Sequence, residues 1–296
     1  MVNKERIREV LRMVLMMLEG HSTPGFNDAV QDLLRAKQGL RARTLSEIRS
    51  VCFRLMRGVP GLASRKVGEI SRSECEGLIK LAPTPRQQRK FRTILHGLFA
   101  HCCRQEWVAV NPVEWIATPR LQEHEIVPLA WHELKHLLSL ARAGRHRCCM
   151  PPVGLMLWAG VRPAELLRLQ WSDIDWEESV ISLRPQHSKT GGCRHIQLQP
   201  VLRAWLREHG AGQGNICPPN WMRRWRLLRD AAGLSPWRQD VLRHTFASYH
   251  AKHFHDFARL QEDMGHRSAA LLRTRYLSMQ GLTAAHARLF WTPGAL

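Results

Sequence analysis

Tyrosine is scarce in this chain, with 2 tyrosines against 11 tryptophans in 296 residues. The eight cysteines contain no C-x-x-C spacing, and two pairs, Cys102-Cys103 and Cys148-Cys149, are adjacent. This pattern argues against a zinc site or a disulfide framework and is typical of reduced, mostly buried thiols in a cytosolic protein. Long apolar runs are also lacking, so we expect no membrane partner and a cytoplasmic protein.

Acidic residues are few: 25 Asp and Glu stand against 44 Lys and Arg, which gives a net charge of +19. Such a field attracts polyanions, above all nucleic acid. The excess is even along the chain, because residues 1–124 hold 21 basic and 12 acidic residues (+9) and residues 125–296 hold 23 and 13 (+10). Two lobes that grip one polyanion fit this distribution better than a basic tail. Membrane-surface and ribosomal proteins show similar totals, so charge alone leaves the partner open.

Helical spacing dominates the first 118 residues. Residues 1–20 are predicted to form an amphipathic packing helix rather than a signal peptide, because Arg12 interrupts the apolar run. Residues 21–118 are predicted to form a helical domain. Prolines and the loss of helical periodicity predict a linker at residues 119–124. The predicted helices cover residues 27–40, 44–58, 71–82 and 84–105, the second beginning with a capping pattern from Thr44 to Glu47.

Residues 125–296 form a second predicted domain, in which helices surround two short strands. Helical patterns cover residues 130–144, residues 151–171 with a break at Gly160, and most of the chain after residue 201. Residues 179–185 and 193–200 are predicted to be strands joined by a polar turn with two glycines. The fold class is therefore predicted to be mainly α with a small antiparallel β-sheet (α+β).

Three basic residues occupy positions suited to phosphate binding. Arg162 lies at a predicted helix N-terminus, Lys189 at the tip of the predicted hairpin, and Arg243 on a helix with an apolar core face. A single arginine in such a place is ordinarily a surface residue. These three are followed by His266 and then by Tyr276, which lies between Arg275 and a leucine, and the order of the set is what points to a common site.

The motifs G-x-R-x-x-E-L, a lysine in Lys-Thr-Gly, L-R-H-T-F-A, G-H-R-S and T-R-Y follow one another in this chain. Together they resemble the catalytic half of the tyrosine recombinases, the phage integrase family, over about residues 125–280. The basic helical region before them resembles that family's core-binding domain. The resemblance implies a site-specific recombinase that cleaves and rejoins DNA through a 3′-phosphotyrosyl intermediate. It assigns the roles as follows: Tyr276 the nucleophile, Arg162 and Arg243 the phosphate clamp, Lys189 the mobile general acid, and His266 a further phosphate contact.

The chemistry of strand exchange suits these roles. A covalent tyrosyl phosphate stores the energy of the broken phosphodiester without ATP. A phenol of ordinary pKa, about 10, needs nearby cations and a proton acceptor to attack at neutral pH. Two guanidinium groups stabilise the charge that develops on the phosphate oxygens. No metal ion and no cofactor is required or expected, and the other tyrosine, Tyr249, is predicted to be part of the core.

One residue departs from the family pattern. Three residues before Arg243 the family usually has histidine, or sometimes lysine, and this chain has Asp240. The carboxylate is a candidate acceptor for the tyrosine proton, or it pairs with an arginine of the clamp. The departure keeps a second hypothesis open, a DNA-binding protein on the same fold with attenuated or no cleavage. A third, a type IB topoisomerase, fits the small helical lobe and the motif spacing less well.

The predicted helix over residues 84–105 has a basic face opposite an apolar stripe. We expect DNA contacts from Arg86, Arg89, Lys90 and Arg104. The resemblance implies a partner, double-stranded DNA at the recombination site of a mobile element, and tetramers on paired sites, associated with the nucleoid. The apolar face predicted for the tail, formed by Leu282, Ala285, Leu289 and Phe290, either folds back on its own domain or docks on a neighbouring subunit, and the resemblance favours the second.

Overall fold

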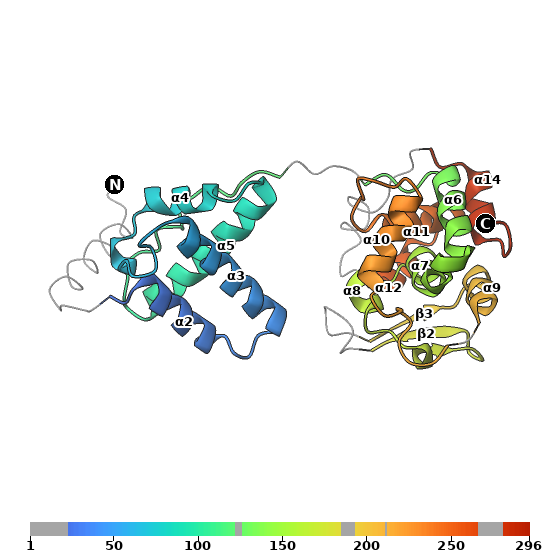
Figure 1. The fold of residues 1–296 in the computed structure, drawn as a ribbon, viewed down its shortest axis with the longest axis horizontal. Helices are drawn as coiled ribbons and strands as arrows, with labels where there is room; N and C mark the ends of the chain where they lie inside the picture. The colour runs from blue at the N-terminus through green and yellow to red at the C-terminus, as the bar shows by residue number, and fades with distance from the viewer. Residues whose placement is uncertain (1–22, 122–125, 185–192, 211, 266–280) are drawn as a thin grey trace. The chain divides into compact units, whose positions relative to one another are not determined.

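The structure is a computed structural model that describes residues 23–121, 126–184, 193–210, 212–265 and 281–296. The chain divides into two compact units, Met1–Glu123 and His124–Leu296, which we call the N-terminal unit and the C-terminal unit. Helices dominate both, and a three-stranded antiparallel sheet lies in the C-terminal unit (Figure 1). The predicted fold class is thus confirmed. None of the described helices combines the length and apolar character needed to cross a bilayer.

In the described part of the N-terminal unit, four α-helices pack around one core. They are α2 (Phe26–Ala36), α3 (Ala42–Gly58), α4 (Arg72–Lys80) and α5 (Pro85–Arg104), with a 3₁₀ turn at Val67–Glu69. Ser71 and Glu74 form a capping box at the start of α4, and Thr84 caps α5 ahead of Pro85. The apolar stripe predicted for α5 lies in this core: Phe91, Leu95, Leu98 and Phe99 are buried, and Ile94 is partly buried against them.

The predicted capping pattern at Thr44 is wrong. Helix α3 begins two residues earlier, at Ala42, and Thr44 lies inside its first turn. The Glu47 carboxylate forms an ion pair with Lys90 of α5, with 3.2 Å between Oε1 and Nζ. The Glu47 side chain, which the sequence pattern assigned to the helix cap, therefore makes a tertiary contact instead.

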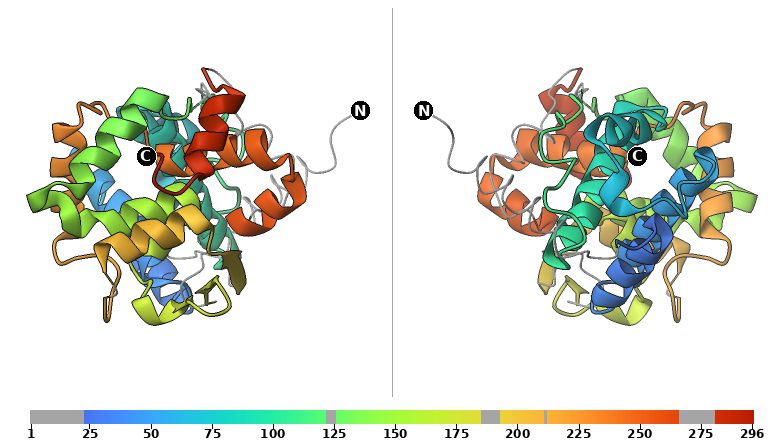
Figure 2. Two further views of the ribbon diagram at one scale, coloured as in Figure 1. Left: turned by 90° about the vertical axis from the view of Figure 1, so that its right-hand side faces the viewer. Right: turned by 90° about the vertical axis from the view of Figure 1, so that its left-hand side faces the viewer.

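The C-terminal unit is built around α7 (Met150–Trp158), in which every residue is buried. Helix α9 (Pro200–His209) packs beside it (Figure 2). The helices approach closely at Gly154, where a Cβ atom would lie 2.5 Å from Cδ1 of Trp205. The other helices that the structure describes in this unit are α6 (Trp131–Arg142), α8 (Pro163–Leu166), α10 (Trp221–Ala231), α11 (Val241–Phe254), α12 (Phe257–Met264) and α14 (Ala284–Trp291), with 3₁₀ turns at Gly144–Cys149 and Trp171–Asp173.

The sheet runs in the order β1 (Ile174–Asp175), β2 (Val180–Leu183) and β3 (Arg194–Gln197), with both pairs antiparallel. Ile181 of β2 faces Ile196 of β3, and both are buried. The predicted strands are thus confirmed. The register also fixes Arg194 opposite Leu183, at the end of the ladder next to residues 185–192.

The tail packs on its own unit. Phe290 and Trp291 of α14 are buried, and the Trp158 indole donates to the carbonyl of Phe290 at 2.9 Å. Tyr249 of α11 lies against the Phe290 ring, with centroids 4.3 Å apart. The predicted apolar face is wrong in its register, because Leu289 is 42% exposed and Ala285 is also exposed. The tail instead buries Leu282, which precedes α14, and Ala287, Phe290 and Trp291 of the helix.

Candidate active site and nucleic-acid surface

Arg162 lies at the N-cap of α8, in the short connection that follows α7. Gly160 makes this connection possible, because its φ is 56° and a Cβ atom there would lie 2.4 Å from Cδ1 of Phe246. The break predicted at Gly160 and the first-turn position of Pro163 are both confirmed. The Arg162 side chain is 22% exposed, so its guanidinium is held by the protein but still reaches solvent.

Glu165 holds Arg162 from the same helix. The carboxylate accepts from Arg162 Nη1 at 2.8 Å and from the Arg162 backbone N–H at 3.1 Å. It also receives a bidentate fork from Arg194 of β3, at 2.9 and 2.7 Å. Burial alone would raise the pKa of Glu165, but the hydrogen bonds and charge of Arg194, with those of Arg162, lower it from 4.5 to about 2. The carboxylate is therefore ionised and its acceptor sites are filled.

Arg243 is a buried residue of α11, only 2% exposed. Its Nη1 donates to the carbonyl of Gly160 and its Nη2 to the carbonyl of Met264. The predicted core face of α11 is confirmed, since Tyr249 and its apolar neighbours on this helix are buried. Arg243 links the connection before Arg162 to the end of α12. It therefore gives the site both structural support and positive charge.

The end of α12 collects three arginines from three different elements. The carbonyls of the consecutive residues 263–265 each accept from one guanidinium. The pairs are Asp263 with Arg194 Nε at 3.1 Å, Met264 with Arg243 Nη2, and Gly265 with Arg162 Nη2 at 2.9 Å. The last carbonyls of a helix have no partner within the helix and carry its negative dipole end, so cations stabilise them.

Lys189, His266 and Tyr276 lie outside the described residues. In the chain, the segment that holds His266 and Tyr276 starts directly after Gly265, at the carbonyls that the arginines bind. Residue Lys189 belongs to the connection between β2 and β3, of which Arg194 is the first described strand residue after the turn. The described part of the site thus consists of Arg162 and Arg243, brought to one helix end, with Glu165 and Arg194 beside them.

Asp240 occupies the N-cap of α11 with a left-handed backbone, φ 60° and ψ 14°, and no cap hydrogen bond from its side chain. Aspartate tolerates this conformation better than most residues. Within the ranges that the structure describes, no ion pair joins Asp240 to Arg162 or Arg243. The half-buried carboxylate therefore does not hold either arginine in place.

The basic residues expected to contact DNA are all exposed on α5. Arg86, Arg89 and Lys90 share its first two turns, whereas Arg104 lies about 27 Å from Arg86 along the axis, at 1.5 Å per residue. The structure therefore brings together only three of the four. Together with Lys37 they line a groove of about 600 Å³ whose floor is apolar, formed by Leu33, Leu40, Ile48, Ile94 and Leu121.

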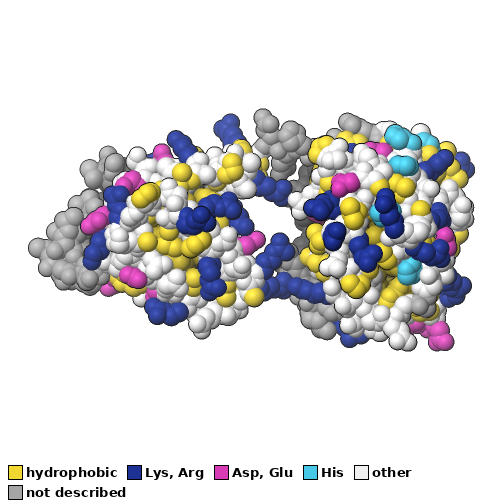
Figure 3. Space-filling model, viewed as in Figure 1, with side chains coloured by type: hydrophobic (Ala, Val, Ile, Leu, Met, Phe, Trp, Pro, Cys, Tyr) yellow, Lys and Arg dark blue, Asp and Glu magenta, His cyan; other side chains and the backbone are white. Residues whose placement is uncertain are grey.

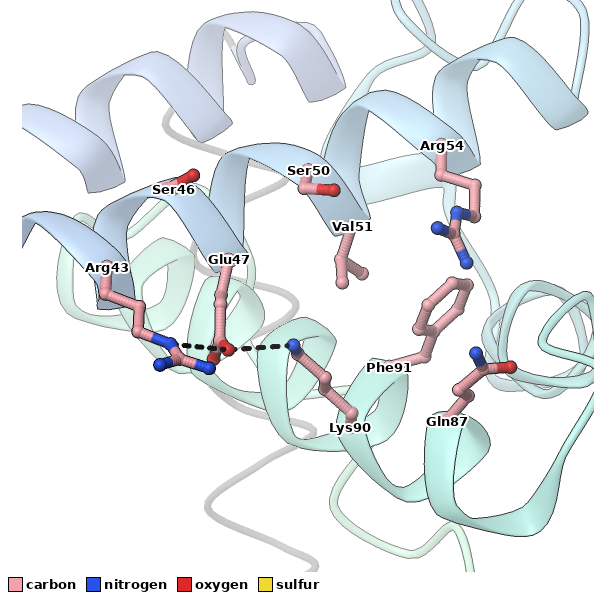
Figure 4. Close-up of a pocket in the computed structure, with 9 residues that line it drawn as sticks. All are labelled: Arg43, Ser46, Glu47, Ser50, Val51, Arg54, Gln87, Lys90 and Phe91. Carbon is pink, nitrogen blue, oxygen red and sulfur yellow. Dashed lines mark ion pairs between the residues drawn. The ribbon is translucent and has the colours of Figure 1, made fainter. Parts of the chain in front are cut away.

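A second groove, of about 370 Å³, lies between α3 and α5 (Figure 4). Arg43 and Lys90 flank the Glu47 carboxylate there, at 3.9 and 3.2 Å, and Arg54 points in from the other end of α3. The polar residues Ser46, Ser50 and Gln87 and the apolar residues Val51 and Phe91 complete the lining. The two grooves share Lys90 and Glu47, so α3 and α5 present one continuous basic surface. Lys and Arg side chains are spread over the faces of both units in Figure 3.

Sequence reasoning missed Arg43 and Arg54 of this surface, although a signal was present. They are 11 residues apart and, with Ser50 between them, repeat at helical spacing opposite the buried residues of α3. It also missed Glu165 and Arg194. The R-x-x-E spacing on a helix start signals Glu165, whereas nothing local signals Arg194, because its partner is 29 residues away.

The donors of a metal site do not come together in the described ranges, where no three His, Cys, Asp or Glu side chains are grouped to share an ion. All eight cysteines are free. Burial raises the pKa of Cys52, Cys75, Cys102 and Cys149 to about 12, so these thiols are structural rather than reactive.

Comparison with known proteins agrees with this geometry. The tyrosine recombinase XerC of Chlamydia muridarum is 24% identical over 136 residues, which are 44% of this chain and 41% of XerC. The integrase of Salmonella phage P22 is 26% identical over 210 residues, 62% of this chain and 52% of the integrase. The chain thus matches about half the length of these curated relatives. A lambda integrase dimer bound to a COC′ core site has the same fold, with a TM-score of 0.74 at 18% identity over 91% of this chain and 82% of the other.

The match to a family model covers more than half of the chain, and the matched range includes every residue of the arginine site. Residues 128–281 match the model of the phage integrase family. This range includes Arg162, Glu165, Arg194 and Arg243, and also the segment with Tyr276. The chain belongs to the phage integrase family.

Proposed function

We propose that this chain is a site-specific tyrosine recombinase, which cleaves and rejoins DNA through a 3′-phosphotyrosyl intermediate at Tyr276. The observation that carries the proposal is the convergence of Arg162 and Arg243 on the end of α12, directly before the segment with His266 and Tyr276. A partly exposed guanidinium held by a buried carboxylate is a preorganised phosphate site.

The proposed reaction is an in-line displacement at phosphorus. The phenolic oxygen of Tyr276 attacks the scissile phosphate, a P–O bond to tyrosine forms, and the P–O bond to the 5′ oxygen breaks. The phenol gives up its proton to a base, for which the Asp240 carboxylate is the candidate, and the leaving 5′ oxygen takes one from Lys189. Arg162 donates to a non-bridging oxygen with the N–H groups that Glu165 and Gly265 do not use. The reverse displacement, by a 5′ hydroxyl of a partner strand, rejoins the DNA.

The partner proposed for both units is double-stranded DNA. The surface of α3 and α5 supplies Arg86, Arg89 and Lys90, with Arg43 and Arg54 beside them. Solved structures with this fold include lambda integrase as a dimer on a core site and as a tetramer on a Holliday junction. We extend such assembly to this chain, on a recombination site of a mobile element. Its tail packs on its own unit, so the contacts between subunits are proposed without a role for α14.

Asp240 supports the alternative function, a DNA-binding protein with weak or no cleavage. Its carboxylate is half-buried at the start of α11, three residues before Arg243, and among the described contacts it pairs with neither arginine of the clamp. A negative charge near a phosphate opposes its binding. The same carboxylate is the residue best placed by sequence to accept a proton from Tyr276, so the two functions differ in whether an adduct forms.

The test is covalent capture. Duplexes selected from a random library by binding to the protein define the site, and a nick near the cleavage position then traps the intermediate. We expect the wild-type protein to form an adduct that survives denaturation, and Tyr276→Phe to bind the duplex with similar affinity but to form none. Tight wild-type binding without an adduct, even at high protein concentration, would assign the alternative function.

Tyr249→Phe is the matched control. Its phenol is buried against Phe290, and burial raises its pKa to about 12, so it is a poor nucleophile. The Tyr249→Phe protein should form the adduct as the wild type does. An adduct in Tyr276→Phe that disappears in Tyr249→Phe would move the nucleophile to α11.

A further inference from the structure

The proposed reaction assigns no role to Arg194. This arginine lies on β3 with a side chain 11% exposed. Its three guanidinium nitrogens are all engaged: Nη1 and Nη2 donate to Glu165, and Nε donates to the carbonyl of Asp263. A side chain bound in this way has little capacity to contact DNA, so its function must be exerted on the residues that it holds.

Glu165 is the first of these residues. Its carboxylate is 1% exposed and accepts from Arg162 and Arg194 together. A planar guanidinium in a fork fixes the plane of the carboxylate, which a lysine cannot do. Removal of one partner from a buried ion pair leaves a charge without compensation. With Arg194 gone, Glu165 would rotate toward Arg162 and draw that guanidinium away from an incoming phosphate.

The end of α12 is the second. Arg194 binds the carbonyl of Asp263, one residue before the carbonyl that Arg243 binds and two before the one that Arg162 binds. Gly265 leaves the room for this, since a Cβ atom on it would lie 3.1 Å from Arg194 Nη1 and 3.4 Å from Arg162 Nη1. Arg194 thus connects β3 to both the clamp and the helix end after which the Tyr276 segment begins.

We propose that Arg194 is a positioning residue for DNA cleavage, which orients Arg162 through Glu165 and fixes the end of α12 through the carbonyl of Asp263. The inference rests on the proposed function, because the step that it serves is the proposed cleavage. It goes further in assigning β3 to the same mechanical unit as the clamp. Strand β3 and the clamp then move together rather than independently.

The experiment compares Arg194→Gln and Arg194→Lys with the wild type in single-turnover cleavage at saturating nicked DNA. We expect Arg194→Gln to cleave about 10²-fold more slowly, the scale of one lost transition-state donor, with a DNA Kd within a factor of about three because few of the total phosphate contacts change. Arg194→Lys keeps the charge without the fork and should cleave at an intermediate rate. Equal losses in rate and affinity would make Arg194 a DNA contact instead.

Arg184→Gln is the matched control. Arg184 lies just beyond β2 and also pairs with a buried carboxylate, Asp173, at 3.2 Å, but it has no bond to α8 or α12. A loss of folding common to hairpin arginines would slow both proteins, whereas a positioning role slows Arg194→Gln alone. Glu165→Gln combined with Arg194→Gln should be no slower than the slower single variant, because the two act through one contact.

Two outcomes overturn the inference in different ways. A wild-type protein that forms no adduct overturns the proposed function and this inference with it. A wild-type adduct, with folded Arg194→Gln and Arg194→Lys proteins that cleave at the wild-type rate, overturns the inference alone.

Discussion

Gly265 ends α12 in the left-handed region, at φ 59°. Because it has no side chain, it leaves room for the guanidinium groups of Arg194 and Arg162. In Gly265→Ala the backbone strain costs about 1–2 kcal/mol, and the methyl group meets Arg194 Nη1 at 3.1 Å. We expect cleavage to slow more than stability alone explains, because both arginines must shift. Gly233→Ala is the control, since Gly233 has a φ of 68° but open space around it. Equal cleavage by the two folded variants would contradict the steric argument.

His250 is a buried histidine of α11, 3% exposed. Its ring packs against the rings of Phe246, Phe254 and Trp291. Burial lowers its pKa from 6.5 to about 4, with Arg259 and His253 adding to the effect and Asp256 opposing it. The folded state thus prefers neutral His250. Its contribution to stability is complete above pH 6.5 and is lost as the pH falls from 6.5 toward 4.

His250→Phe keeps an aromatic ring but binds no proton. Between pH 7 and 4 its free energy of unfolding should therefore fall less than that of the wild type, by up to about 3 kcal/mol at 1.4 kcal/mol per pKa unit. Chemical denaturation at a series of pH values measures both curves. His244, whose pKa burial also lowers to about 4, contributes equally to both proteins. Parallel curves would show that the fold accommodates a charged His250.

The residues of the arginine site differ in how far the sequence predicts them. Arg162 and Arg243 stand in motifs, and their convergence is found in the structure. The burial of Arg243 was not predictable, because it depends on Gly160 and Met264, which are 83 and 21 residues away. Arg194 carries no local signal for the same reason. Motifs identify the side chains, whereas their hydrogen bonds depend on packing between elements.

At the scale of elements, periodicity predicted the helices well and their ends less well. Helix α5 has its predicted apolar stripe and its Thr84 cap. Helix α3 begins before the predicted cap, and Glu47 forms an ion pair with Lys90 on α5 instead of capping the helix. The tail helix has the predicted amphipathic character in a shifted register, since Phe290 and Trp291 enter a pocket of aromatic residues on α7 and α11. Each difference follows from a contact distant in sequence.

Helix α14 provides the prediction at this scale. Phe290 is fully buried against Trp158 and Tyr249, so Phe290→Ala should lower the free energy of unfolding of the C-terminal unit by about 3–5 kcal/mol. Leu289→Ala, at a residue 42% exposed on the same helix, should change it little. Thermal or chemical unfolding of the full chain measures both. If Phe290→Ala kept full stability and lost assembly on DNA instead, the tail would belong to a neighbouring subunit.

At the scale of the whole molecule, the dominant property is charge. The two halves of the chain carry net charges of +9 and +10 by residue count; the basic surface of α3 and α5 belongs to the N-terminal unit and the arginine site to the C-terminal unit. Neither half is electrically neutral, so neither serves only to position the other half. Each should therefore bind duplex DNA by itself through released counterions.

Separation of the chain between residues 121 and 126 tests this arrangement. Each half should bind DNA weakly and the intact chain much more tightly, because tethering raises the effective concentration of the second contact. Contacts to six phosphates would give the intact chain a slope near −5 in a plot of log K against log salt, about −0.9 for each phosphate. Arg89→Gln should reduce the magnitude of the slope by about one such step, whereas Glu76→Gln, on α4 away from both grooves, should leave it unchanged. A slope near zero, or one half with all the affinity, would contradict a two-unit grip on DNA.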